Sequence, residues 1–245
     1  AKARGAKVID YDRLTLKGST AYYVSFNNVA VGRLQGRGLV NCLKASGAYS
    51  KKPVIAQLHG SPTDNNATLF RRGYQSVLNP LFKQGILVQG PAQAVPDWDN
   101  QKARTIFEQM LVRTGNKIHG VAAANDGLGN AAISALKARK LPKIPVTGQD
   151  ATAQGVQNIL AGDQCMTVYK AIKAEANAAA KLAVSLVRGQ KPAGVNGKTY
   201  DGRRQVPSVL LVPVTITKKN YTLLFTDGFL KKSEVCRGAY AKYCK

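Results

Sequence analysis

The sequence is poor in most of the residues on which catalytic and metal sites depend. Its 245 residues include two histidines, four cysteines, three glutamates and one tryptophan. No Cys-x-x-Cys pair or Cys/His spacing indicates zinc, no Gly-x-Ser-x-Gly elbow is present, and HGSPTDNN (59–66) is not a glycine-rich phosphate loop. The sequence therefore predicts no catalytic residue, no metal and no cofactor.

Two weaker arrangements for catalysis exist. His59 ends a predicted strand near Ser61 and Asp64, but no base is placed to activate the serine. Asp64 and Asp150 could form the carboxylate pair of a glycoside hydrolase, although amides and cations surround both. His119 begins a strand and is expected to be structural. An enzyme is thus the least favoured class.

Long apolar runs are also absent. None approaches the roughly eighteen residues of a membrane span, and no signal peptide is visible. The chain opens on AKARGAKVIDYDR, which resembles the end of a helix followed by a strand, so we expect a mature fragment or a truncated chain.

Acidic residues are scarce relative to basic ones, 13 against 36, which gives a net charge of +23. Such a surplus favours anionic partners in general: nucleic acid, anionic lipid or cell-wall polymer. The basic residues occur singly and in pairs, and no nucleic-acid recognition motif accompanies them. We therefore expect a basic solvated surface and no specific nucleic-acid role.

The four cysteines give a weak indication of location. Cys236 and Cys244 lie eight apart in the C-terminal segment, where a disulfide would fix a tail that otherwise frays. Such a bond would indicate an oxidising, extracytoplasmic location. Cys42 lies in a helical pattern and Cys165 in a strand-like pattern, so both are expected to be buried thiols.

Short apolar runs alternate with helical patterns along the chain, which predicts an α/β fold with parallel sheets flanked by helices. The predicted strands are 8–11, 22–26, 54–58, 86–88, 118–124, 146–147, 165–169 and 209–214. The predicted helices are 28–44, 66–84, 99–114, 129–139, 152–161 and 171–188.

Polar side chains gather at the positions that follow these strands. Because right-handed crossovers place all strand-to-helix loops at one edge of a parallel sheet, such residues are expected to meet there. Six of the ten aspartates fall at these positions, while all three glutamates lie elsewhere. Helix capping explains some of them but not Arg13 or Lys170, which cannot accept from a helix N-terminus. The pattern predicts a ligand site.

The mixture of side chains suits a small neutral polyol. Each sugar hydroxyl both donates and accepts, and charge-assisted hydrogen bonds contribute about 1.5–3 kcal/mol each. Trp98 would offer a flat apolar face to the C–H side of a pyranose ring. In the pair Asn125-Asp126, we expect Asn125 to reach the ligand and Asp126 to cap the helix behind it.

Several segments together carry a resemblance to a known family. They are YDR (11–13), YYVSFNNVAVGRLQ (22–35), HGSPTDNNATLFRRG (59–73), PDW (96–98), AAANDGLGNAAISAL (122–136), TGQDA (147–151), MTVYKAI (166–172) and VPSVLLVPVTITKKN (206–220). In this order and spacing they resemble the D-xylose-binding proteins of bacterial ABC sugar importers, within the ribose/galactose-type periplasmic binding proteins. The resemblance spans nearly the whole chain.

The resemblance implies a two-lobed type I fold that binds a sugar without chemistry. Carried over by position, Arg13 resembles an arginine that clamps ring hydroxyls, and Trp98 resembles the stacking aromatic. Lysine at 170 and tryptophan at 98 favour xylose over ribose. The remaining implied hydroxyl ligands are Asp64, Asn65, Asn66, Asn125, Asp150 and Lys170.

The resemblance implies that the sequence lacks the N-terminal part of the family's first lobe. We expect residues 1–27 and 171–205 to be the remnant of that lobe, 28–170 to form the other lobe, and 206–245 to be a return strand and a disulfide-stapled tail. Missing strands would leave apolar sheet edges exposed, so a second chain supplying the half-lobe is a predicted partner.

The predicted function is therefore an extracytoplasmic monosaccharide-binding protein, most consistent with D-xylose, that delivers its ligand to an ABC importer permease. Two alternatives use the same fold. One is an extracytoplasmic sensor paired with a histidine kinase or chemoreceptor, and the other is the effector domain of a sugar-responsive repressor. An oxidised Cys236–Cys244 pair would count against the repressor.

Overall fold

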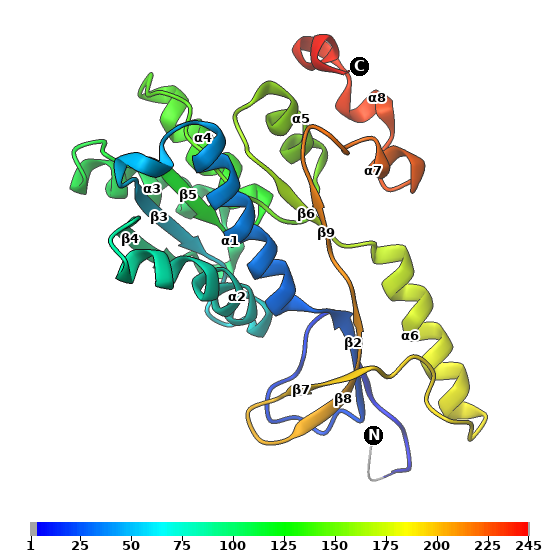
Figure 1. Ribbon diagram of the computed structural model, residues 1–245. Coiled ribbons are helices and arrows are strands. Elements are labelled where there is room, and N and C mark those ends of the chain that lie inside the picture. Colours follow the sequence, from blue (N-terminus) through cyan, green and yellow to red (C-terminus); the bar gives the residue numbers. More distant parts are fainter. Residues whose placement is uncertain (1–3, 245) are drawn as a thin grey trace. The chain divides into compact units, whose positions relative to one another are not determined.

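The computed structural model describes residues 4–244 (Figure 1). The chain divides into two compact units, Ala1–Asn28 with Lys170–Pro213 and Val29–Tyr169 with Val214–Lys245. Residues 206–245, treated above as one segment, are thus divided between the units after Pro213. Within the described part no helix combines the length and apolar character that a bilayer crossing requires.

The second unit is built on a parallel sheet of three strands in the order β4-β3-β5. An isolated parallel bridge from Val121 to Val146 extends it beyond β5, where the sequence predicted a short strand. The strands are β3 (Val54–His59), β4 (Val88–Ala94) and β5 (Gly120–Ala123).

Helices cover both faces of this sheet. Alternate residues of β3 point to opposite sides and pack with different helices. Ile55 packs with residues of α1 and α2, whereas Ala56 and Leu58 pack with α3 and α4. The predicted α/β arrangement, a parallel sheet flanked by helices, is therefore confirmed for this unit. The four helices are α1 (Asn28–Ala45), α2 (Asn65–Lys83), α3 (Asn100–Arg113) and α4 (Asp126–Ala138).

The two helices on the Ile55 side lie unusually close together. At Gly32 of α1 a Cβ atom would overlap the backbone carbonyl of Phe70, and at Gly73 of α2 it would overlap the carbonyl of Val29. Glycine is therefore needed at both positions for the backbones to approach one another. The pair forms a single closely packed layer on the sheet.

The C-terminal segment completes the second unit. The strand β9 (Val214–Ile216) pairs antiparallel with β6 (Thr167–Tyr169), and the tail contains α7 (Leu223–Thr226), α8 (Lys232–Val235) and the 3-10 helix η4 (Gly238–Tyr243). The tail packs on α5 (Ala153–Ala161), where Gln157 Nε2 donates to the carbonyls of Glu234 (3.2 Å) and Val235 (3.1 Å).

The disulfides differ from the sequence prediction in one respect. Cys236 and Cys244 are bonded, as predicted. Cys42 and Cys165, expected to be separate buried thiols, form a second disulfide that joins α1 to the segment before β6, with their Cα atoms 6.3 Å apart. Both side chains are only partly buried. Their proximity could not be predicted from local patterns, because it depends on how two segments 123 residues apart in sequence pack together.

The first unit has a four-stranded sheet in the order β1-β2-β8-β7. The strands β1 (Ile9–Tyr11), β2 (Tyr22–Phe26) and β8 (Gln205–Leu211) are parallel, and β7 (Gly197–Tyr200) runs antiparallel to β8. The helix α6 (Ile172–Val187) packs on it through Leu182, against Val24 and Val209. Because β1 is an edge strand, Tyr11 remains 46% exposed.

Candidate ligand-binding site

Four loops meet at the carboxyl edge of the second unit's sheet. The backbone N–H of Val95 donates to the carbonyl of His59 (3.0 Å), which joins the loops after β4 and β3. That of Asp126 donates to the carbonyl of Gln149 (2.9 Å), which joins the loop after β5 to the next one. The arrangement predicted from parallel strand order therefore brings together the loops that carry Asp64, Trp98, Asn125 and Asp150.

Asp64 links the first two of these loops. It is the N-cap of α2 and is only 6% exposed; its Oδ1 accepts from the backbone N–H of Asn66 (2.9 Å). Its Oδ2 accepts from Trp98 Nε1 (3.2 Å). Asp64 thus caps a helix and also fixes the orientation of the indole. The two N–H donors stabilise its carboxylate, which would be unfavourable if it were buried without hydrogen-bond partners.

The indole of Trp98 is held from several sides. Trp98 lies at the end of the 3-10 helix η3 (Pro96–Trp98), and both Asp97 (φ 59°) and Trp98 (φ 57°) are in the left-handed region. The ring meets Phe70 edge to face at a centroid distance of 6.4 Å. Two consecutive residues in this region are unfavourable without support from the surrounding structure.

Gly60 is a position that the sequence reasoning missed. A Cβ at this residue would fall among the six-membered ring atoms of Trp98. The indole therefore lies directly against the backbone of the loop after β3. The sequence could not single out Gly60, because a glycine after a strand is also typical of an ordinary turn.

Asn65 and Asn66 form the first turn of α2. Asn66 is 4% exposed. The Nδ2 of Asn65 is buried and has no hydrogen-bond partner in the described part of the chain. A buried amide donor left without a partner is unfavourable, which singles Asn65 out among the polar residues of this edge.

The role of Asp126 differs from the prediction. Asn125 is the N-cap of α4, in extended conformation, and its Oδ1 accepts from the backbone N–H of Leu128 (2.9 Å). Asp126 is 1% exposed and accepts from Thr152 N (2.8 Å) and Gln164 Nε2 (2.8 Å). The expectation that Asp126 caps the helix was therefore wrong: the residue with extended backbone provides the cap.

Asp126 supports the loop that carries Asp150. Burial raises the pKa of Asp126 to about 7, against the lowering effect of its hydrogen bonds. Asp150 (φ 98°) and Ala151 (φ 51°) both have left-handed backbone. The loop is held by hydrogen bonds from Asp150 N to the Val168 carbonyl (2.9 Å) and from Thr152 N to Asp126.

Gln35 is a second residue that the sequence reasoning missed. Its side chain is 1% exposed and lies at the carboxyl edge of the sheet. Nε2 is within hydrogen-bond distance of the carbonyls of Ala123 (3.1 Å), Ala124 (3.0 Å) and Gly148 (3.2 Å). One helix side chain therefore positions the loops of both Asn125 and Asp150. The sequence did not indicate that Gln35 is buried, because a polar residue on an amphipathic helix is normally expected on the exposed face.

His59 is a neutral, buried side chain. It is 5% exposed, and Nδ1 is hydrogen-bonded to the Tyr74 hydroxyl. Burial, together with the nearby Arg71 guanidinium, lowers the pKa of His59 to about 4. The imidazole therefore remains uncharged at neutral pH. Ser61 Oγ instead lies 3.0 Å from Thr63 Oγ1 and accepts from the backbone N–H of Asp97 (3.2 Å).

Arg13 and Lys170 belong to the first unit, unlike the other six predicted ligands. Arg13 is exposed and follows β1, next to Asp12 with its left-handed backbone (φ 59°). Lys170 is partly buried and precedes α6. In the first turn of α6, burial and then the charge of Asp12 raise the pKa of Glu175 to about 7, while Lys170 acts to lower it.

A family model described as a periplasmic binding protein domain matches residues 1–191. The chain belongs to the periplasmic binding protein family. It is 40% identical over 237 residues to the D-xylose-binding periplasmic protein of Escherichia coli K12, covering 96% of this chain and 69% of that protein. It is 36% identical over 248 residues to the multiple sugar-binding periplasmic receptor ChvE of Rhizobium radiobacter, covering 94% and 69%.

A solved structure gives the same result at the level of the fold. An ABC transporter solute binding protein from Clostridium phytofermentans, with bound β-D-glucose, superimposes with a TM-score of 0.88 at 30% identity. The match covers 96% of this chain and 76% of that one. The predicted type I periplasmic-binding-protein fold is therefore confirmed, over about 70% of the length of the relatives.

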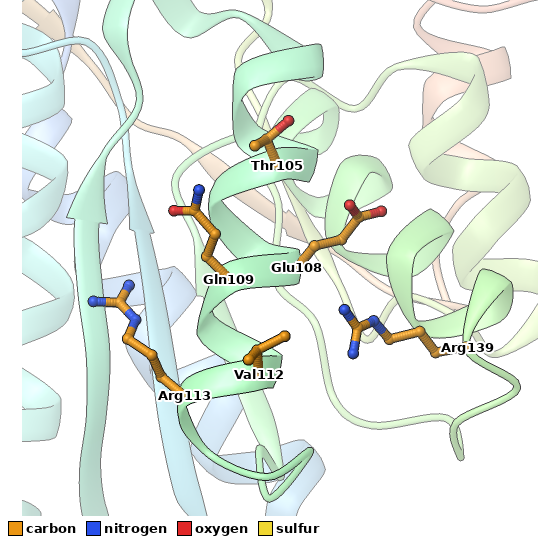
Figure 2. A pocket seen from close by; sticks show the side chains of 6 residues that line it. All are labelled: Thr105, Glu108, Gln109, Val112, Arg113 and Arg139. Carbon is orange, nitrogen blue, oxygen red and sulfur yellow. The ribbon is translucent and has the colours of Figure 1, made fainter.

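One cavity of this periplasmic binding protein lies away from the loops described above. It is an open hollow of about 480 Å³ beside the C-terminal half of α3 (Figure 2). Figure 2 shows Arg113 and Arg139 on opposite sides of Val112. Because α3 begins near Trp98 and runs away from the carboxyl edge, this hollow does not coincide with the candidate site.

Proposed function

We propose that this chain binds a monosaccharide, D-xylose above the others, outside the cytoplasm and delivers it to the permease of an ABC importer without altering it chemically. The E. coli relative is named for D-xylose, and the bound sugar of the C. phytofermentans structure is glucose. The Rhizobium relative is named for several sugars. A pentose or hexose in its ring form is therefore the ligand class that fits the relatives.

The observation that carries the proposal is the pair formed by Asp64 and Trp98. Asp64 holds the indole N–H, so the ring is fixed before any ligand arrives. An indole face contacts the C–H side of a pyranose, and a carboxylate beside the ring accepts from a sugar hydroxyl. Preorganisation of this kind reduces the ordering cost of binding.

Amide donors complete the hydroxyl contacts. The unpartnered Nδ2 of Asn65 is a donor for which a hydroxyl oxygen is a suitable acceptor. Asn66, Asn125 and Asp150 are proposed as further ligands on the same edge. Arg13 and Lys170 of the first unit are proposed as sugar ligands on the sequence resemblance alone.

The disulfides favour the extracytoplasmic assignment. Both cysteine pairs are bonded, and such bonds persist where the environment is oxidising. They count against the effector domain of a cytoplasmic repressor, which would be exposed to reducing conditions.

Titration calorimetry of the 245-residue chain against xylose, ribose, arabinose and glucose tests the proposal. We expect binding of xylose in the micromolar range, about 8 kcal/mol, because a few charge-assisted bonds suffice for it. Trp98→Ala and Asp150→Ala should each weaken binding more than tenfold. Absence of binding to all four sugars would refute the proposed function. Unchanged affinity in both variants would refute the assignment of the site.

Val112→Ala is a matched control for these variants. Val112 is 64% exposed on α3 and lies in the hollow away from the carboxyl edge. Its truncation should leave sugar affinity within twofold of the parent chain. A loss as large as that of Trp98→Ala would mean that the assay reports general stability instead of ligand contacts.

A further inference from the structure

The layer formed by α1 and α2 has an unusual charge distribution. These two helices contain six basic residues and no aspartate or glutamate. The opposite layer, α3 and α4, contains both signs, with Glu108 and Asp126 among its residues. The basic surplus of the chain is therefore not evenly spread over the second unit. The six residues, here called the basic layer, are Arg33, Arg37, Lys44, Arg71, Arg72 and Lys83.

The basic layer faces solvent. All six residues are exposed, whereas the apolar residues of both helices pack inward with Ile55 of β3. On α1, Arg33, Arg37 and Lys44 recur at intervals of four and seven residues, which places them on one face. Lys51 and Lys52, in the connection from α1 to β3, are also exposed and add two more positive charges.

These charges are not neutralised by the protein. None of the six basic residues makes an ion pair within the described part of the chain; the ion pairs of this unit involve Asp97, Glu108 and Asp163. Lys44 Nζ lies 5.0 Å from the ring centroid of Tyr49, a contact that retains its charge. The layer thus presents a positive potential that an external anionic group would complement.

The chemistry of the face indicates what kind of partner it suits. No large apolar side chain of α1 or α2 is among the exposed ones, so the aromatic anchors of a protein interface are missing. Stacking aromatics, on which single-stranded nucleic acids rely, are missing from it too. A surface that is charged, helical and without anchors suits electrostatic adsorption to phospholipid headgroups.

We propose that the α1/α2 layer binds the surface of an anionic phospholipid bilayer without inserting into it. Each lysine or arginine close to such a surface strengthens adsorption about fivefold. The interaction is screened by salt, since the Debye length falls from about 10 Å at 0.1 M to about 3 Å at 1 M. This proposal does not depend on the sugar site, because the face uses none of its residues.

Co-sedimentation of the full chain with vesicles tests the proposal. We expect binding to vesicles of equal parts phosphatidylglycerol and phosphatidylcholine, and none to pure phosphatidylcholine. High salt should release the protein. Binding to both vesicle types, or to neither, would overturn the proposal, as would binding that resists salt.

A charge-reversal pair separates the face from the net charge. The layer variant carries glutamate at Arg33, Arg37, Arg72 and Lys83; Arg71, whose charge affects His59, and Lys44 are left unchanged. The control variant carries glutamate at four exposed positions at or just after the C-terminal ends of α3 and α4, namely Arg113, Lys117, Arg139 and Lys140. The layer variant should lose at least ten times more binding than the control.

Equal losses in the two variants would mean that total charge alone is responsible, which would overturn the assignment to this face. A layer variant with glutamine at the same four positions keeps the test informative if the glutamates impair folding, and circular dichroism verifies the fold of each. Binding to soluble polyglutamate but not to vesicles would assign the layer to an acidic protein and overturn the bilayer.

Discussion

The disulfide between Cys42 and Cys165 should be the largest single source of stability in the second unit. It closes a loop with a sequence separation of 123, whereas the tail disulfide, Cys236–Cys244, closes one of only 8. The two loops do not overlap in the sequence. Their contributions can therefore be removed separately, by replacing each pair with serine.

The expected magnitudes follow from the entropy that each loop removes from the unfolded chain. For the long loop the chain-entropy relation gives about 5 kcal/mol at 25 °C, and for the short loop about 2.5 kcal/mol. These are upper values when strain or residual structure is present, but their order is fixed by loop length. We expect the paired substitution of Cys42 and Cys165 to reduce the free energy of unfolding by about twice as much as that of the tail pair.

Urea unfolding monitored by tryptophan fluorescence provides the assay. The chain has one tryptophan, Trp98, and it lies in the same unit as both disulfides, so the signal reports on the unit concerned. The variant without the long-range bond should also show a steeper denaturant dependence, because its unfolded state is more expanded. The parent chain with reductant present should resemble a variant lacking all four cysteines.

Two outcomes would refute this reasoning. If loss of the tail disulfide reduces stability as much as loss of the long-range one, the entropy of loop closure does not govern the effect. If reductant leaves the unfolding curve unchanged, the two cysteines are not bonded in solution, and the earlier expectation of separate thiols would be restored.

Three further predictions concern single positions. Gly32→Ala should reduce stability by several kcal/mol in urea unfolding, because its Cβ would overlap the carbonyl of Phe70 and the helices would separate; a loss below 1 kcal/mol would contradict the packing. Gly60→Ala should displace the indole of Trp98 and weaken sugar affinity more than tenfold by calorimetry; unchanged affinity would mean that the indole position does not matter. Glu175→Gln should raise the free energy of unfolding at pH 8 and flatten its pH dependence. The pKa of Glu175 is raised to about 7 in the folded chain, so its carboxylate is less favourable there than in the unfolded chain. The parent should therefore gain stability as pH falls from about 8 toward 4.5. Asp126, whose pKa is also raised to about 7, remains in both proteins, so a variant whose stability changes with pH as steeply as that of the parent would contradict the role of Glu175.

The helices and central strands could be predicted because apolar periodicity reports burial directly. The predicted helix at 28–44 and the strand at 22–26 agree with α1 and β2. The strand expected at 86–88 was wrong in position: β4 spans Val88–Ala94, through QGPAQA. As an edge strand it needs neither an apolar pattern nor a hydrogen bond from the nitrogen of Pro91, so local sequence carried little signal.

The strand expected at 209–214 was two strands, β8 and β9, which belong to different units. A continuous apolar run hid the change of partner at Pro213, since parallel and antiparallel neighbours select similar residues. The strand β7 was not predicted at all. Its sequence, GKTY, is short and half exposed.

At the site, the loop positions of the polar residues could be predicted, but their partners could not. Strand order alone places Asp64, Trp98, Asn125 and Asp150 at one edge. The bond from Trp98 to Asp64 and the clamp by Gln35 depend on side chains from distant elements, which a single sequence does not pair. Which of two adjacent residues caps α4 depended on backbone angles.

The cap on α4 has a consequence for how the proposed ligand would be discriminated. Because Oδ1 of Asn125 accepts from Leu128 N–H, the orientation of its amide is set, and Nδ2 is the group that this amide can donate. Asp64 offers the opposite polarity, with acceptor oxygens alone. A deoxyfluoro sugar, whose fluorine accepts but cannot donate, should therefore be tolerated at the hydroxyl beside Asn125 and rejected at the hydroxyl beside Asp64. Measuring the affinity of a series of sugars, each with fluorine in place of one hydroxyl, would therefore show which hydroxyl lies beside Asn125 and which beside Asp64.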